Sequence, residues 1–129
     1  MKNKLMIFAL VCCVFTSFVG CVRTLDERVH GGMPFKKDSI EGRYDRSVAQ
    51  LFDTAKVVLT REGTLVGENT ISKVLEANVN NNRVWVKVEE VKPKVTRIVV
   101  QARDRYSNGN IELAAQIKEK IALALVNAR

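Results

Sequence analysis

Residues 83–103 read RVWVKVEEVKPKVTRIVVQAR, and this stretch decides the fold. Apolar and polar side chains alternate on both sides of the Lys-Pro-Lys sequence at 92–94, which is typical of a turn. A period of two residues predicts β-strands, here at 83–91 and 95–103. Since only a short turn joins them, we expect the two strands to be antiparallel neighbours.

The alternation also predicts the face that each side chain occupies. Val84, Val86 and Val88 share one face of the first strand and are expected to enter the core. On the opposite face, the aromatic ring of Trp85 stands among basic residues such as Lys87 and Arg97, and this combination suits protein or glycan recognition. Two alternatives remain open: the long basic side chains shield the ring, or the faces are reversed and the ring belongs to the core. The opposite face is therefore a candidate partner-binding face, and its residues are Trp85, Lys87, Arg97, Val99 and Arg103.

Further strands are predicted on the N-terminal side of this hairpin. Residues 71–79 alternate, although Lys73 interrupts the pattern, and residues 64–68 read as a short strand or a turn. Three asparagines at 80–82 form the next turn, because asparagine tolerates left-handed backbone angles. The sequence therefore predicts an antiparallel sheet of three to four strands.

Two amphipathic helices flank the strands. Apolar side chains recur at helical spacing in 44–61, and Gly63 is a plausible end of that helix. A second apolar stripe predicts a helix at 111–127. A sheet with one apolar face must bury it, and two helices suffice to cover it. We therefore expect a small α+β domain at 43–129, in the order α-β-β-β-α, with both helices packed on one face of the sheet.

The first twenty residues resemble a secretory signal. Lys2 and Lys4 precede an uncharged, mostly apolar run at 5–19. That run is short for a bilayer span, which needs about 20 residues. The alternative is an uncleaved anchor helix, but the basic stop-transfer cluster that should follow such an apolar run is missing from the sequence. Residues 1–20 are therefore predicted to be a signal peptide.

The end of this segment, Phe18-Val19-Gly20-Cys21, resembles the lipobox of bacterial lipoproteins. In that family a peptidase cuts before the cysteine, whose thiol carries a diacylglycerol. Gly20 and Cys21 fit the pattern, whereas Phe18 stands where an aliphatic residue is usual. Ordinary signal cleavage fits less well, because it prefers a small residue at that same place. The resemblance implies lipidation at Cys21 and attachment to a membrane. By analogy, Val22 in place of aspartate indicates the periplasmic side of the outer membrane, if the cell has one.

Processing of this kind changes the chemistry of the mature chain. Two of the three cysteines leave with the signal and the third is lipidated, so no thiol remains for a disulfide, a metal or catalysis. Loss of Lys2 and Lys4 lowers the formal charge from +7 to +5. A basic chain can bind nucleic acid, but export makes nucleic acid an unexpected partner. Glycine and proline interrupt residues 22–42, so residues 21–42 are predicted to be the lipidated cysteine and a flexible tether.

The lipobox, the short tether and the α-β-β-β-α order together resemble a family of small bacterial lipoproteins known only as domain of unknown function 3568. The matching stretches are 44–63, 83–88, 96–100 and the helix from Ile111, within residues 20–127. The resemblance implies a membrane-anchored domain at the cell surface or in the periplasm. The family has no known catalytic residues, so none is transferred to this chain.

Motifs that carry chemistry are scarce. The sequence contains neither a phosphate-binding loop nor a G-x-S-x-G nucleophile motif. The single histidine, His30, lies in the expected tether without convergent metal ligands. Asp104 lies between two arginines, which is typical of a solvated charge cluster. We therefore predict no catalytic, metal-binding or cofactor-binding residues, and no cofactor.

The expected function is that of a membrane-anchored lipoprotein of the cell envelope that binds an envelope protein or a cell-wall polymer without catalysing a reaction. Two alternatives stay open. The protein is an envelope hydrolase with an unrecognised site, or it is a passive spacer. The hydrolase requires a concave pocket with convergent polar groups. The spacer predicts that no partner is recovered reproducibly from detergent-solubilised envelope.

Overall fold

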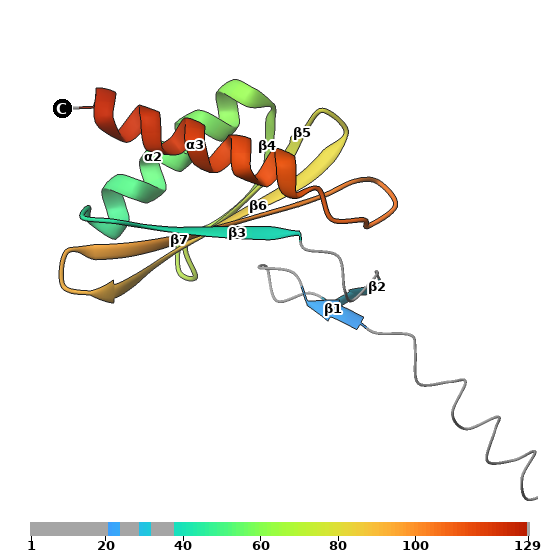
Figure 1. Ribbon diagram of the computed structural model, residues 1–129, viewed down its shortest axis with the longest axis horizontal. Coiled ribbons are helices and arrows are strands. Elements are labelled where there is room, and N and C mark those ends of the chain that lie inside the picture. Colours follow the sequence, from blue (N-terminus) through green and yellow to red (C-terminus); the bar gives the residue numbers. More distant parts are fainter. Residues whose placement is uncertain (1–20, 24–28, 32–37, 129) are drawn as a thin grey trace, which may run out of the picture.

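A computed structural model of the chain describes residues 21–23, 29–31 and 38–128. The fold is α+β, and its main sheet is antiparallel with the strand order β3-β7-β6-β5-β4. Figure 1 shows both helices on one side of this sheet. The elements are β1 (Cys21–Arg23), β2 (Val29–Gly31), β3 (Ser39–Tyr44), α2 (Val48–Glu62), β4 (Thr64–Asn69), β5 (Val74–Val79), β6 (Asn82–Lys92), β7 (Val95–Arg103) and α3 (Ile111–Asn127).

The hairpins of the sheet follow from their turn residues. Asn80 and Asn81 have φ angles of 49° and 61°, the left-handed values that a tight hairpin between β5 and β6 requires. Lys94, with a φ of 63°, turns the chain from β6 into β7. The two predicted turns are therefore confirmed at 80–81 and 93–94, whereas Asn82 and Lys92, which were predicted to belong to them, are the first and last residues of β6.

The helices start at capping side chains. The Ser47 hydroxyl accepts a hydrogen bond from the Gln50 amide at 3.2 Å, and the Asn110 side chain accepts one from the Leu113 amide at 3.1 Å. Each bond satisfies one amide that the first turn of a helix leaves unpaired. The Gly63 amide donates to the Leu59 carbonyl at 3.0 Å, so α2 ends where glycine was expected to end it.

The core lies between the helices and the inner face of the sheet. Every second residue of the central strands enters it. Burial of a valine, leucine, isoleucine or phenylalanine side chain contributes roughly 1.5–3 kcal/mol to stability. The buried cluster contains Leu51, Phe52, Ala55, Val58, Leu59, Leu75, Ala77, Val79, Val84, Val86, Val88, Ile98, Val100, Ala102, Leu113, Ala114, Ile117, Ile121 and Leu125.

The sheet has five strands, not three to four, and a strand rather than a helix precedes the rest of the domain. The added strand is β3, whose residues were expected in the tether and at the start of the first helix. It pairs with β7 from Ser39↔Gln101 to Tyr44↔Thr96. Ile40 and Tyr44 of β3 pack against the core. Gly42 lies between them on the same face and has no side chain, so the alternation of apolar residues that marks a strand is interrupted in the sequence.

This strand changes the topology. β3 and β4 lie at opposite edges of the sheet, so α2, which joins them in sequence, has to cross one face. The predicted domain start at residue 43 falls inside β3, and the predicted helix start at 44 moves to Val48. In the main sheet, the register of β3 with β7 begins at Ser39.

The predicted signal peptide at 1–20 lies outside the described residues. The backbones of β1 and β2 pair antiparallel, with Cys21 opposite Gly31 and Val22 opposite His30. Within the ranges that the structure describes, no helix is both long enough and apolar enough to cross a bilayer. Lipidation of Cys21 remains a prediction.

Candidate functional site

The five residues of the predicted partner-binding face all lie on the side of the sheet away from the helices. They alternate along β6 and β7 with the buried valines and isoleucine of the core, so the reversed assignment is wrong. Trp85 is nevertheless only 3% exposed and Arg103 only 4% exposed. Lys87, Arg97 and Val99 are half-buried. Partner binding by this face stays a prediction.

Arg97 is neutralised by acidic neighbours on this face. Its Nη2 pairs with Glu89, its partner in the β6–β7 register, and its Nη1 lies 3.5 Å from Oε2 of Glu41 on β3. A guanidinium between two carboxylates offers little net charge to a partner. The centre of the outer face is therefore a charge-balanced surface.

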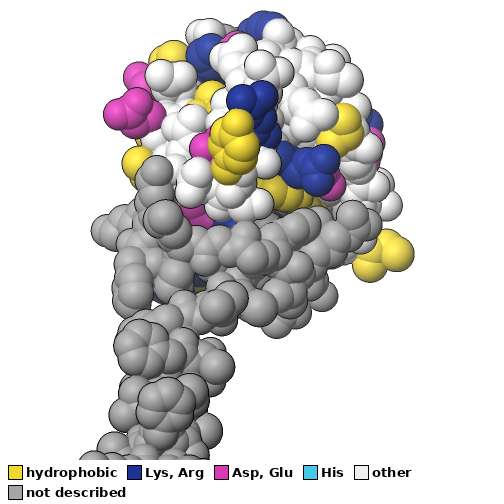
Figure 2. All heavy atoms as spheres, turned by 90° about the vertical axis from the view of Figure 1, so that its right-hand side faces the viewer, with side chains coloured by type: hydrophobic (Ala, Val, Ile, Leu, Met, Phe, Trp, Pro, Cys, Tyr) yellow, Lys and Arg dark blue, Asp and Glu magenta, His cyan; other side chains and the backbone are white. Residues whose placement is uncertain are grey.

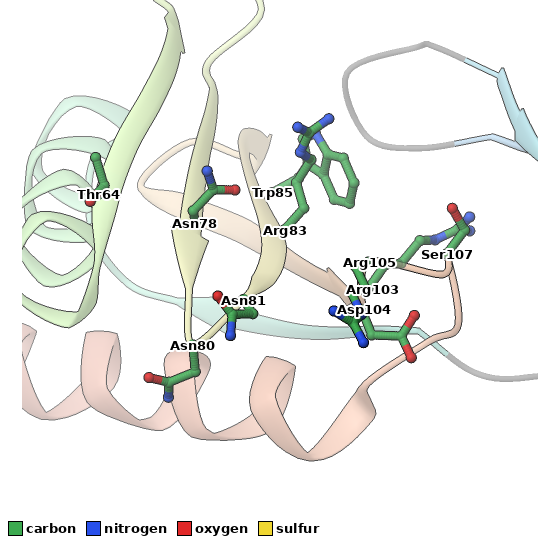
Figure 3. Close-up of a pocket in the computed structure, with 10 residues that line it drawn as sticks. All are labelled: Thr64, Asn78, Asn80, Asn81, Arg83, Trp85, Arg103, Asp104, Arg105 and Ser107. Carbon is green, nitrogen blue, oxygen red and sulfur yellow. The ribbon is translucent and has the colours of Figure 1, made fainter.

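A pocket opens at one end of the same face (Figure 3). The turn between β5 and β6 and the loop after β7 lie at this end of the molecule, on the right in Figure 1. The pocket has a volume of about 770 Å³, which is in the range of small-molecule sites. Its described lining consists of Thr64, Asn78, Asn80, Asn81, Arg83, Trp85, Arg103, Asp104, Arg105 and Ser107.

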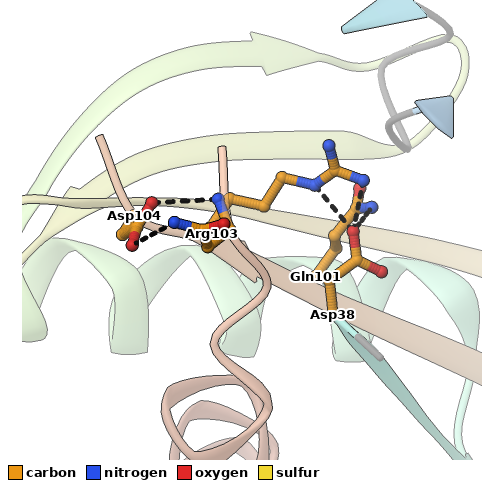
Figure 4. Close-up of polar contacts among 5 residues, drawn as sticks. Asp38, Gln101, Arg103 and Asp104 are labelled. Atoms are coloured by element: carbon orange, nitrogen blue, oxygen red, sulfur yellow. Dashed lines mark hydrogen bonds and ion pairs between the residues drawn. The ribbon is translucent and has the colours of Figure 1, made fainter. Parts of the chain in front are cut away.

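Arg103 is the buried wall of this pocket. Its Nε donates to Oδ2 of Asp38 at 2.6 Å, and its Nη2 pairs with the same oxygen (Figure 4). Nε2 of Gln101 donates to that oxygen as well, at 2.7 Å. The remaining nitrogen, Nη1, is withdrawn from solvent and has no hydrogen-bond partner among the described residues. A buried N–H group without an acceptor costs about 1–3 kcal/mol, more when it is charged.

Two arginines of the pocket lining are backbone neighbours across the strands. Arg83 at the start of β6 and Arg103 at the end of β7 are register partners. Like charges directly opposite one another destabilise a sheet. Each has an acidic neighbour: Nε of Arg83 lies 3.2 Å from Oε1 of Glu76, and Arg103 has Asp38. Each acid offsets part of the repulsion between the two arginines, so both positive side chains can remain at the wall of the pocket.

Asp104 organises the loop that lines one side of the pocket. Its Oδ1 accepts the backbone amides of Tyr106 at 2.8 Å and Asn108 at 2.9 Å, and its Oδ2 accepts Nδ2 of Asn108 at 3.2 Å. Ser107 adopts a left-handed φ of 64° inside this loop. The Arg105 guanidinium lies over the Tyr106 ring, 4.7 Å from its centroid. Asp104 is thus a loop-forming residue, not the solvated charge that the sequence indicated.

The lining is rich in hydrogen-bond donors. Three arginines, three asparagines, a serine and a threonine contribute to it, against one carboxylate. The oxygens of that carboxylate already accept bonds from the loop. Figure 2 views the molecule from this end and shows basic side chains beside exposed hydrophobic ones. Such a surface can bind a ligand that carries acceptor oxygens or negative charge.

The described residues provide little else for chemistry. They contain no group of three or more His, Cys, Asp or Glu side chains that could hold a metal ion. The hydroxyls of Thr64 and Ser107 have no histidine beside them in the described lining. His30 pairs through its backbone with Val22 in the β1–β2 ribbon.

Of the predicted face, Trp85 and Arg103 belong to the pocket, whereas Lys87, Arg97 and Val99 do not line it. Sequence reasoning missed Arg83, the asparagine turn and Arg105 as neighbours in space. One signal was available: Arg83 and Arg103 are the two ends of the hairpin, and its pairing brings them together.

No protein-family model matches the chain, and no curated protein matches it. The resemblance to domain family 3568 and to lipoproteins with a lipobox therefore stays a prediction.

Proposed function

We propose that the protein is a lipoprotein anchored through Cys21 in the bacterial cell envelope, and that its folded domain binds an envelope component without catalysing a reaction. The observation that carries the binding role is the pocket of about 770 Å³, on which side chains from β4, β5, β6, β7 and the following loop converge. A passive spacer has no need of such a site.

The composition of the pocket favours binding over catalysis. Its donors are arginine guanidinium groups and amides, which hold a ligand in place but do not transfer protons at neutral pH. General acid–base catalysis uses groups whose pKa lies near the working pH. The described lining offers Asp104 alone among carboxylates, and that side chain is bonded to the loop.

The anchoring half of the proposal is tested by acyl labelling. Cys21→Ser is expected to abolish incorporation of labelled fatty acid and to leave an uncleaved precursor. Cys12→Ser is the matched control, because Cys12 lies within the predicted signal, and it should be labelled like the wild type. Equal labelling of the Cys21→Ser protein contradicts the anchor.

The binding half is tested by photo-crosslinking in intact cells. A photoreactive amino acid replaces Asn78, an exposed residue of the pocket lining, or Lys92, an exposed residue at the opposite end of β6. We expect a discrete adduct from position 78 and none from position 92. Identical adducts from both positions, or none from position 78, contradict binding at the pocket.

A further inference from the structure

We propose that the ligand of the pocket carries a phosphate group, which the exposed arginines at 83 and 105 bind, with the buried Arg103 as a further positive charge at the same wall. This inference rests on the proposed binding function and names the chemistry of its ligand. The three guanidinium groups come from separate places: the start of β6, the end of β7 and the loop after β7. Arg83 and Arg103 are backbone neighbours across the β6–β7 hairpin, while the Arg83 side chain pairs with Glu76 on β5 and the Arg103 side chain with Asp38 before β3.

The acids beside the pocket leave donors unused. Glu76 approaches Arg83 through Nε, so this ion pair leaves both Nη groups of Arg83 for a ligand. Asp38 takes Nε and Nη2 of Arg103, and Nη1, which is closed off from solvent, has no acceptor among the described residues, so its positive charge is felt at the wall without a direct bond to the ligand. Arg105 is exposed and stacks on the Tyr106 ring, which orients its planar group without neutralising it. This set of donors therefore lacks an anionic acceptor, which a ligand can supply.

The shape of the donor set favours phosphate over carboxylate. A carboxylate is planar, and one guanidinium fork can satisfy its two oxygens. A phosphate ester is tetrahedral and presents three acceptor oxygens in different directions. Arginines at 83 and 105, on separate elements of the pocket lining, can approach such a group from different sides, and the side chains of Asn78 and Asn81 add neutral donors at the same lining.

The phosphate can belong to a soluble phosphorylated molecule or to a lipid headgroup. Both sources present the same group to the arginines. A domain held at a membrane meets headgroups at high local concentration, and a pocket of this volume also accepts a small phosphorylated molecule. The experiment separates these sources.

Trp85 provides the measurement, because it is the only tryptophan of the chain and it lines the pocket. The full chain in nonionic detergent is titrated with sodium phosphate at constant ionic strength and neutral pH, and tryptophan emission is followed. We expect a saturable change. Arg105→Ala and Arg83→Ala should each weaken the apparent affinity about tenfold or more, since each removes charge-assisted hydrogen bonds to the phosphate.

Arg61→Ala is the matched control. Arg61 is an exposed arginine in the last turn of α2, outside the described pocket lining, so its removal changes the net charge equally. It should leave the phosphate titration unchanged. Circular dichroism of each variant checks that the fold is retained.

Vesicles identify the source of the phosphate. If phosphatidylglycerol vesicles change the Trp85 emission and free phosphate competes with them, the ligand is a headgroup. If only free phosphate acts, the ligand is soluble, and either pattern supports the proposal. The proposal is overturned if phosphate gives no saturable change, if acetate binds as tightly, or if Arg61→Ala weakens the titration as much as Arg105→Ala. A persistent crosslink from position 78 combined with a silent phosphate titration leaves the binding function standing and rejects phosphate as its ligand.

Discussion

Arg103, the last residue of β7, and Asp38, the residue before β3, form an ion pair although they are 65 positions apart in sequence. The arginine side chain is 4% exposed and the aspartate 14%. The Ala102 amide also donates to the Asp38 carbonyl at 2.9 Å. Backbone and side chain together therefore fix the start of the edge strand β3 to the strand that carries the pocket.

Removal of Asp38 should destabilise the domain strongly. Asp38→Ala leaves the Arg103 guanidinium buried without its counter-charge, which typically costs about 3–5 kcal/mol. The free energy of unfolding is measured by urea denaturation of the full chain in detergent.

The double variant Asp38→Ala, Arg103→Met supplies the control. Because methionine needs no counter-charge, it should recover much of the stability lost in Asp38→Ala. Equal stability of Asp38→Ala and the wild type contradicts the role assigned to this pair.

Gly63 is predicted to tolerate no side chain. A Cβ built on it collides with the backbone carbonyl oxygen of Asn78, where the end of α2 approaches β5. Gly63→Ala should therefore cost about 1–3 kcal/mol through overpacking. Gly67 is the matched position on β4, where an added Cβ stays 3.4 Å from the nearest atom, the Glu76 Cβ. Thermal denaturation should show a clear loss of stability for Gly63→Ala and little change for Gly67→Ala; similar losses for both disagree with the close approach.

Asp104→Ala should loosen the loop at 104–108 without unfolding the domain. The substitution removes the acceptor of the Tyr106 and Asn108 amides, and each such bond contributes roughly 0.5–1.5 kcal/mol. Hydrogen exchange at these two amides should become about ten- to hundredfold faster, while α2 keeps its protection. Unchanged exchange in the loop means that Asp104 does not form it.

Tyr44 gives the domain a pH dependence in the alkaline range. Burial removes water from its hydroxyl and raises the pKa above its usual value of 10.0. The folded state therefore keeps a proton that the unfolded chain releases, so stability is complete below about pH 10 and falls as pH rises through the folded-state pKa. Urea denaturation between about pH 8 and pH 11 should show this decline, and Tyr44→Phe should make it shallower. An identical slope in both proteins contradicts the assignment.

Much of the fold could be predicted from local pattern. Alternation at 83–103 predicts β6, β7 and their pairing, because a period of two residues and a short turn leave few other arrangements. The asparagine turn and the glycine after α2 are equally local signals. β3 was missed because it is stabilised by contacts with β7 and α3, which lie far away in sequence. In addition, Gly42 interrupts the apolar pattern of the face that β3 turns toward the core.

The site was predicted less well, for a related reason. The face of Trp85 follows from alternation, but its burial does not, since exposure depends on what surrounds the ring in space. Asp104 reads as one charge among arginines until its bonds to Tyr106 and Asn108 are seen. The pocket combines residues from four strands, the turn at 80–81 and the loop after β7, and no single stretch of sequence contains that combination.

The central claim is that the end of the sheet at the asparagine turn and the loop after β7 is the binding surface of the protein. Hydrogen–deuterium exchange of the full chain, compared between native envelope vesicles and purified protein in detergent, tests it most directly. We predict slower exchange in the envelope at residues 79–83 and 103–108, with the exposed side of α2 unchanged. Equal exchange in both preparations, or protection confined to the helices, contradicts the claim.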